Sequence, residues 1–237
     1  MMETLWLYEL QNGETQISFA FFHKLYYTIN CIKIMVYYVR EIMGKIFCLM
    51  GKSACGKDTL YKRVLAEGSL PLKTLVPYTT RPARDEEANG VEYYFFTEGQ
   101  LEELERQGNI IELRSYHTVH GIWKYFTAND HQINLEKHHY LIIGTLESYA
   151  KFQEYFGKPS LVPLYIELED GERLQRALNR ERMQSEPKYT ELCRRFLADD
   201  KDFSPENLKQ AEITNSFSNT DLDLCTQQII SFIKANI

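Results

Sequence analysis

Several marks of other protein classes are missing from this sequence of 237 residues. Its five cysteines are scattered and no two have the C-x-x-C spacing, so we expect neither a zinc site nor a disulfide framework but reduced thiols in a cytoplasmic protein. The formal net charge is −6, which argues against general binding to nucleic acid or to an anionic membrane. Small phosphorylated ligands remain compatible with this charge, because they need only a local basic pocket.

A long uninterrupted apolar run is also missing. The most apolar segment, residues 17–40, is broken by charged and polar side chains, whereas a membrane span needs about 18 apolar residues in sequence. It is an appended amphipathic helix, a weak membrane anchor, or upstream sequence translated from a misplaced start codon. The last is favoured because Met43 stands directly before the first expected strand. We therefore expect 1–42 to be an extension outside the core, and 43–237 to form the domain.

From residue 45 onward, short apolar runs alternate with segments of helical pattern. The runs that predict strands are 45–50, 74–78, 91–96, 140–144, 161–168 and 211–215. The segments that predict helices are 57–67, the stretch between Thr97 and Gly108, a segment after residue 144 that ends at Phe156, 172–182, 190–202, and a last helix after Thr220 whose apolar face reaches Ile233. Strands separated by helices imply an α/β fold with a doubly wound, mostly parallel sheet flanked by helices.

Single residues sharpen some of these boundaries. Thr97 and Gln100 have the spacing of a capping box, and Gly108 follows the end of the same helix. Thr220 is expected to cap the last helix. Pro163 suggests an edge strand or an early position within its strand, because proline cannot donate to a sheet ladder.

Residues 51–59, GKSACGKDT, have the frame of a phosphate-binding loop. In that frame, G-x-x-x-x-G-K-[S/T], the two glycines permit a tight turn, and backbone N–H groups point at an anion before the start of a helix. Gly51, Gly56 and Lys57 occupy the fixed positions, and the expected strand and helix flank them. The alternative, a chance Gly-Lys turn, is the weaker interpretation in this context.

The departure from the frame is Asp58, which replaces the Ser or Thr that usually contacts Mg²⁺. A carboxylate is itself a good ligand for a hard cation, so we expect Mg²⁺ still to bind here. Thr59 keeps a hydroxyl for an α-phosphate, and Cys55 is interpreted as a small filler rather than an oxidation sensor. The residues expected to bind ATP in this loop are Gly51, Lys52, Ser53, Ala54, Cys55, Gly56, Lys57, Asp58 and Thr59.

A second segment of interest, the loop rich in Arg and Glu at residues 78–96, reads YTTRPARDEEANGVEYYFF. The guanidinium groups of Arg81 and Arg84 can clamp a phosphate, and the Tyr93 hydroxyl can add a third contact. A solvated loop held by surface salt bridges is the alternative.

With these two motifs in this order, the sequence resembles the guanylate kinase family from about residue 43 to about residue 232. The residues in register with the family's T-T-R-x-P-R-x-G-E-x-x-G-x-D-Y-x-F segment are Thr79, Thr80, Arg81, Arg84, Glu87, Gly90, Glu92, Tyr93 and Phe95. The resemblance implies a P-loop fold with an acceptor-binding subdomain at about 75–126 and a helical lid at about 171–200. It also implies that Arg81, Arg84 and Tyr93 hold the acceptor's phosphate.

The base-reading positions match the family less well. Glu112 in NIIEL corresponds to the glutamate that accepts hydrogen bonds from guanine. His120 and Thr145 also fall at acceptor-binding positions, but His120 stands where the family has tyrosine and Thr145 where it has an acid. Pro77 replaces a serine. The resemblance therefore implies phosphoryl transfer more firmly than it implies GMP as the acceptor.

Arginines in the expected lid complete the set. By resemblance, Arg176, Arg180 and Arg195 close over the phosphates, whereas Arg173 and Arg182 are expected to be ordinary solvated side chains. Asn215, in ITNSF, is expected near the adenine.

Together these features predict an enzyme that phosphorylates a nucleoside monophosphate with ATP and Mg²⁺, GMP being the favoured acceptor. The residues expected to be catalytic are Lys57, Arg81, Arg176, Arg180 and Arg195. Two alternatives stay open: a kinase for another (deoxy)nucleoside monophosphate, and a guanylate-kinase-like binding module without catalysis. No nucleic-acid or membrane partner is expected.

Overall fold

The computed structural model describes residues 26, 28, 31, 43–84, 87–118 and 121–237. The chain divides into two compact units, 1–42 and 43–237. In the first unit only Tyr26, Thr28 and Cys31 are described, and their backbone is helical. Within the described part of the chain, no helix combines the length and the apolar character needed to cross a membrane.

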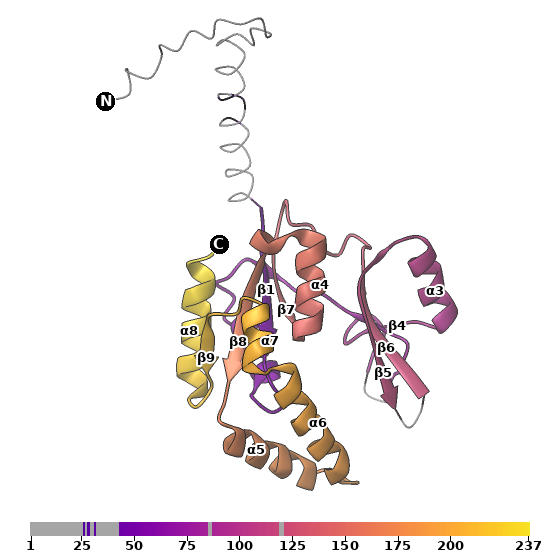
Figure 1. Ribbon diagram of the computed structural model, residues 1–237, viewed down its shortest axis with the longest axis vertical. Helices are drawn as coiled ribbons and strands as arrows, with labels where there is room; N and C mark the ends of the chain where they lie inside the picture. Colours follow the sequence, from indigo (N-terminus) through magenta and orange to yellow (C-terminus); the bar gives the residue numbers. More distant parts are fainter. Residues whose placement is uncertain (1–25, 27, 29–30, 32–42, 85–86, 119–120) are drawn as a thin grey trace, which may run out of the picture. The chain divides into compact units, whose positions relative to one another are not determined.

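The centre of the second unit is a five-stranded sheet with the order β2-β7-β1-β8-β9. All four strand pairs are parallel. The strands are β1 (Ile46–Met50), β2 (Leu72–Lys73), β7 (His139–Ile143), β8 (Leu161–Glu167) and β9 (Ser216–Ser218). The helices α2 (Lys57–Ala66), α4 (Leu146–Phe156) and α8 (Leu222–Lys234) flank this sheet (Figure 1). The expected α/β class with a parallel sheet is confirmed.

The central strand β1 shows why helices cover both faces of the sheet. All five of its residues are buried, which is typical of a parallel strand enclosed between two layers. Phe47 and Leu49 pack in one cluster with apolar residues of α2 and α8. Ile46, Cys48 and Met50 point the other way, into a cluster that contains side chains of α4.

A smaller four-stranded sheet with the order β4-β3-β6-β5 lies beside this core (Figure 1). Its strands are β3 (Tyr78–Thr79), β4 (Tyr94–Phe95), β5 (Ile110–Thr118) and β6 (Gly121–Ala128), and α3 (Glu98–Arg106) accompanies them. The two long strands β5 and β6 are antiparallel. Stacked and edge-on aromatic rings around Tyr78 and Phe126 form its own small core.

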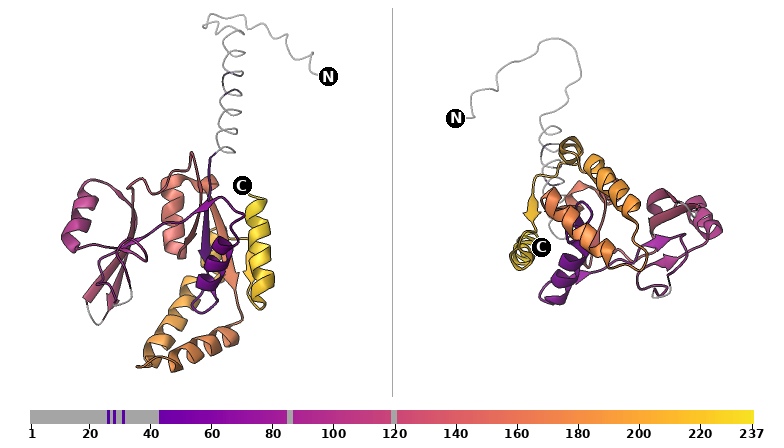
Figure 2. Two further views of the ribbon diagram at one scale, coloured as in Figure 1. Left: turned by 180° about the vertical axis from the view of Figure 1, so that it is seen from behind. Right: turned by 90° about the horizontal axis from the view of Figure 1, so that it is seen from below.

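Two adjacent helices follow β8 beyond the end of the core sheet, α5 (Asp170–Arg182) and α6 (Tyr189–Asp202) (Figure 2). The first is capped by Glu169, whose carboxylate accepts from the backbone N–H groups of Gly171 and Glu172. The short helices η1 (Lys158–Ser160) and α7 (Pro205–Gln210) complete the described elements.

Most expected elements are confirmed within a residue or two, but the short strands are not. The expected strand 74–78 is wrong, because residues 74–77 are irregular and Tyr78 belongs to the second sheet. Only two residues of 91–96 form a strand. The expected strand 211–215 is also wrong, and β9 begins at Ser216 instead. Such short strands carry too few residues for apolar alternation to fix their position.

The signals for single residues had mixed outcomes. The capping box of Thr97 and Gln100 is confirmed. The last helix is capped by Asp221 rather than by Thr220. Pro163 lies in β8, which is not an edge strand, but β9 pairs only with Tyr165–Glu167. The proline therefore occupies the early part of the strand, where the β9 side is unpaired.

Candidate active site

The phosphate-loop segment connects the carboxyl end of β1 to the first turn of α2, which is where ligands bind in open parallel sheets. Gly56 has a φ of 93°, and a Cβ there would lie 2.3 Å from the Asn219 side-chain nitrogen. A Cβ on Gly51 would lie 2.5 Å from the carbonyl oxygen of Ile166. Both glycines are therefore required by close approach of other chain segments as well as by the turn.

Two other loop residues have a structural role. Ala54 has a φ of 63°, which is costly for a residue with a Cβ. Cys55 is fully buried, and burial raises the pKa of its thiol although Lys57 opposes this. A buried thiol with a raised pKa is unreactive, which agrees with its interpretation as a filler.

The side-chain amine of Lys57 makes hydrogen bonds with the backbone of the phosphate loop. Lys57 Nζ donates to the carbonyl oxygens of Gly51, at 2.7 Å, and of Lys52, at 3.0 Å. The Asn219 side chain donates to the carbonyl of Cys55 at 2.7 Å and is itself buried. Two hydrogen bonds within the loop and one from the distant Asn219 therefore hold the loop in its turn.

Carboxylates from α5 and α6 reach the same loop. The backbone N–H of Ser53 donates to Asp199 Oδ2 at 2.7 Å. Lys52 Nζ lies 2.6 Å from Asp200 Oδ1 and 3.4 Å from Asp170 Oδ1. An anionic group thus already occupies one N–H of the loop, in the way that a phosphate oxygen would.

Arg173 organises these acids, and its expected role as a solvated side chain is wrong. It is fully buried, and its Nη1 donates to the carbonyl of Ser53 at 3.2 Å. Its guanidinium nitrogens lie 2.9 Å from Asp170, 3.5 Å from Asp199 and 3.6 Å from Asp200. Burial alone would raise the pKa of Asp170, but Arg173 and Lys52 together lower it.

The other lid arginines differ in their distance from the loop. A Cβ on Gly56 would lie 4.0 Å from Arg176 Nη1, so this guanidinium is beside the loop. Arg176 also bonds Glu172 at 3.0 Å and the carbonyl of Asn219 at 3.4 Å. Arg180 is exposed. Arg195 Nε lies 3.7 Å from Glu191 and makes no hydrogen bond with the described residues.

Asp58 and Thr59 are exposed in the first turn of α2, directly after Lys57. An exposed carboxylate next to the expected phosphates is a suitable oxygen ligand for Mg²⁺, so the residues present fit this ion.

The second cluster centres on Arg81 in the smaller sheet. Its guanidinium makes a bidentate pair with Glu87, with both N–O distances 2.6 Å. It also lies 5.1 Å from the ring centre of Tyr93 and 5.6 Å from that of Phe95. The hydrogen bond from Arg81 is the main cause that lowers the pKa of Glu87 from 4.5 to about 2. Arg81 is buried, and its Nε has no hydrogen-bond partner among the described residues.

Two neighbours extend this cluster. The Tyr125 hydroxyl helps to raise the pKa of Arg81, behind the larger effect of Glu87, and its ring centre lies 5.7 Å from that of Tyr93. The sequence did not single out Tyr125, which lies outside the matched motif. The side chain of Arg84 is exposed, and its backbone N–H donates to Glu87 at 2.9 Å.

Glu112 is buried on β5 and already paired. Arg114 donates hydrogen bonds to its carboxylate from Nε at 2.8 Å and from Nη2 at 3.2 Å. The Thr127 hydroxyl donates a third at 3.0 Å. Thr145 caps α4 by accepting from the backbone N–H of Ser148 at 3.1 Å. His120 lies outside the described residues.

Asn215 is exposed and precedes β9, and it does not lie in a strand, although the sequence predicted one at 211–215. Asn219, four residues later, contacts the loop instead. Asn219 directly follows β9, the strand that the chain forms in this region.

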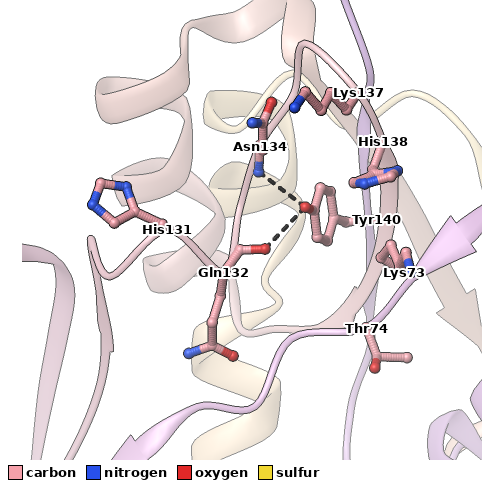
Figure 3. Close-up of a pocket in the computed structure, with 8 residues that line it drawn as sticks. All are labelled: Lys73, Thr74, His131, Gln132, Asn134, Lys137, His138 and Tyr140. Carbon is pink, nitrogen blue, oxygen red and sulfur yellow. Dashed lines mark hydrogen bonds between the residues drawn. The ribbon is translucent and has the colours of Figure 1, made fainter.

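A separate pocket of about 380 Å³ lies near the amino end of β7 (Figure 3). The phosphate loop, in contrast, follows the carboxyl end of β1, which is parallel to β7. The pocket is lined by Lys73, Thr74, His131, Gln132, Asn134, Lys137, His138 and Tyr140. The Tyr140 hydroxyl joins its walls, accepting from the Asn134 N–H and donating to the Gln132 carbonyl, both at 2.9 Å. None of the expected site residues lines this pocket.

Comparison with known proteins identifies the family. The family model for guanylate kinase matches residues 43–235. The chain belongs to the guanylate kinase family. The match includes both clusters described above, together with α5 and α6.

Individual relatives are distant. A guanylate kinase from Malacoplasma penetrans is 29% identical over 171 residues, covering 70% of this chain and 74% of that protein. One from Neisseria gonorrhoeae is 33% identical over 124 residues, covering 52% and 58%. One from Mycoplasmoides gallisepticum is 30% identical over 83 residues, covering 35% and 43%. The matched region thus spans about half the length of these last two relatives.

A solved structure supports the fold. The crystal structure of guanylate kinase from Anaplasma phagocytophilum matches with a TM-score of 0.56 and 20% identity, covering 81% of this chain and 86% of that one.

Proposed function

We propose that this protein transfers the terminal phosphoryl group of ATP to a nucleoside monophosphate, with GMP as the favoured acceptor. The observation that carries this proposal is the presence of two separate sets of anion-binding groups in one domain. One set surrounds the loop of Gly56 and Lys57, and the other surrounds Arg81. A protein that bound only one nucleotide would need only one of them.

Phosphoryl transfer requires little covalent help from a protein, so positioning and charge are the main tasks. The loop's N–H groups and Lys57 bind the donor phosphates. Asp58 would hold Mg²⁺, which would supply positive charge to neutralise those phosphates. Arg176, whose guanidinium is beside Gly56, contacts the phosphoryl group during transfer in this proposal, together with Arg180 of α5 and Arg195 of α6.

Arg81, Arg84 and Tyr93 hold the acceptor phosphate. Glu87 now occupies two nitrogens of Arg81, and the unpaired Nε supplies a further donor. We place the acceptor-binding subdomain at about 75–126 and the lid at about 171–200. The lid excludes water, since an open site would hydrolyse ATP.

The test measures ADP release with ATP and Mg²⁺ in the presence of GMP. Turnover should fall at least a hundredfold, about 2.7 kcal/mol, in Lys57→Ala, as on removal of one stabilising donor. Lys62→Ala is the matched control, because Lys62 is an exposed lysine on the same helix. Undiminished turnover in Lys57→Ala, or equal losses in both variants, would refute the proposed role of the loop.

One observation favours a second candidate, a binding module without catalysis. The N–H of Ser53 and the amine of Lys57 both have partners within the protein. A protein that binds GMP but shows no turnover with ATP and any monophosphate would support this candidate.

A further inference from the structure

The hydrogen bonds of Glu112 leave little of its carboxylate for a ligand. Each carboxylate oxygen has about two lone pairs. Oε1 accepts from Arg114 Nη2 at 3.2 Å and from Thr127 Oγ1 at 3.0 Å, so both of its lone pairs are used. Oε2 accepts from Arg114 Nε at 2.8 Å and keeps one lone pair. Glu112 can therefore accept one further hydrogen bond, through Oε2.

Burial keeps this pair together. The Glu112 side chain is 1% exposed and that of Arg114 is 16% exposed. Opening the pair would leave a buried carboxylate without a counter-charge, which is strongly unfavourable. Burial opposes the charge on Arg114, but the neighbouring carboxylate outweighs this and raises the pKa of Arg114. The two side chains thus act as one rigid unit.

The sheet register places this unit next to the proposed acceptor site. Glu112 and Arg114 are two residues apart on β5, so their side chains share one face of the strand. Arg114 stands directly opposite Tyr125 on β6, and such cross-strand pairs also share a face. Tyr125 in turn contacts Tyr93 of the Arg81 cluster. One face of the sheet therefore carries both the phosphate clamp and the paired charges.

We propose that Arg114 reads the acceptor base together with Glu112, and that the acceptors are monophosphates of bases with a lactam edge, a ring N–H beside a carbonyl. This inference rests on the proposed function and names its substrate class. The ring N–H donates to the remaining lone pair of Oε2. The base carbonyl accepts from Arg114, which has five N–H donors and uses two on Glu112.

The Glu112–Arg114 pair should select a different set of bases from the set that an unpaired carboxylate would select. Guanine, hypoxanthine, uracil and thymine have a lactam edge, whereas adenine and cytosine present an acceptor nitrogen beside an amino group. A free carboxylate can accept from the N1–H and the 2-amino group of guanine at once, one on each oxygen. With Oε1 fully used, the 2-amino group finds no acceptor on Glu112. GMP and IMP should therefore be nearly equal acceptors.

The first experiment compares kcat/KM for GMP, IMP, UMP, dTMP, AMP and CMP with ATP and Mg²⁺. We expect IMP within about threefold of GMP, and AMP and CMP at least about a hundredfold below the best lactam acceptor, because they leave buried polar groups unpaired. A purine or a pyrimidine as the best lactam acceptor agrees equally with the inference. A hundredfold preference for GMP over IMP, or AMP as good as GMP, overturns it.

The variant Thr127→Val tests the lone-pair count directly. It keeps the shape of a buried side chain but removes the O–H that fills Oε1. The preference for GMP over IMP should rise about tenfold, the effect of one added hydrogen bond to a charged group. Thr74→Val, at an exposed threonine outside both clusters, should leave the ratio unchanged. An unchanged ratio in Thr127→Val overturns the inference.

Calorimetric titration of the wild-type protein with GMP, IMP and AMP, without ATP, separates this inference from the proposed function. Similar affinity for GMP and IMP with no turnover would refute the kinase activity and support the reading by Arg114. Turnover with GMP but not with IMP would support the kinase activity and refute the proposed reading of the base by Arg114. If the protein binds neither these three nucleotides nor UMP and dTMP, the inference is overturned.

Discussion

Carboxylates pair with donor groups in both the phosphate loop and the Arg81 cluster, but the sequence distance between the paired residues differs. Arg81 is paired with Glu87, six residues away, and Glu112 with Arg114, two residues away. The loop is paired with Asp199, which is 146 residues from Ser53. The ion pairs on the acceptor side are therefore local in sequence, whereas those on the donor side depend on how α5 and α6 dock.

This difference has a mechanical consequence. Any change that moves α5 and α6 also moves the acids that neutralise the loop, so charge and lid position are coupled on the donor side. On the acceptor side, Arg81 and Glu87 belong to one short segment and move together. Variants should therefore separate the two regions by the step that they impair.

The largest effect is expected from Arg81→Met. Loss of the guanidinium removes the centre of the acceptor clamp, and kcat/KM for the acceptor should fall about a thousandfold, about 4 kcal/mol. The KM for ATP should stay within about twofold, because the donor loop obtains its charges elsewhere. Steady-state kinetics with each substrate varied in turn measures both. Arg106→Met, at an exposed arginine of α3, is the control. An equal loss on the ATP side would break the proposed separation.

Arg173→Met addresses the donor side and should act first on stability. The side chain is 1% exposed, and its removal takes the cation from Asp199 and the Ser53 carbonyl and leaves Asp170 and Asp200 with Lys52 alone. We expect a loss of about 3 kcal/mol in the free energy of unfolding and a fall of about 10 °C in Tm. Denaturant and thermal unfolding measure these quantities. Arg182→Met, at an exposed arginine on the same helix, should change both little. Similar values for the two variants would show that Arg173 is as dispensable as a solvated side chain.

Arg81 and Arg173 also show which parts of this site can be predicted from the sequence. Arg81 and Glu87 lie in one motif that the sequence singled out, although it did not predict that the two would pair. Arg173 and Arg182 lie on the same charged helix, and nothing in the sequence separates the buried one from the exposed one. The distinction arises from the packing of α6, and the acids that surround Arg173 come from two helices.

The fold shows the same limit. The parallel core and its long helices could be predicted because buried strands and amphipathic helices have strong periodic patterns. The short strands 74–78 and 211–215 could not, because so few residues give no clear alternation of apolar and polar side chains. Arg114 and Tyr125 were missed because their roles depend on the register of β5 with β6.

A smaller effect is expected from Asp199→Ala, which frees the N–H of Ser53. If the carboxylate competes with a phosphate for this donor, the affinity for ATP should rise about tenfold, about 1.4 kcal/mol. Titration calorimetry with ATP measures the change. Asp202→Ala is the control, since Asp202 is exposed on the same helix. A weaker affinity would instead mean that Asp199 holds the loop in its binding shape, and the donor side would then depend on α6 for binding.

The last comparison uses pH and the local pair of Arg81 and Glu87. The pKa of Glu87 is lowered from 4.5 to about 2, first by its hydrogen bond with Arg81. A carboxyl with a lowered folded pKa stabilises the protein above its unfolded pKa, and this contribution is lost as pH falls through about 2. Glu87→Gln should therefore be less stable than wild type at pH 6 and lose less stability between pH 5 and pH 2. Urea unfolding across this range measures the slope. Glu136→Gln, at an exposed glutamate, should keep the wild-type slope. A wild-type slope in Glu87→Gln would mean that the acid sensitivity lies elsewhere, with the carboxylates around Arg173 as the next group to test.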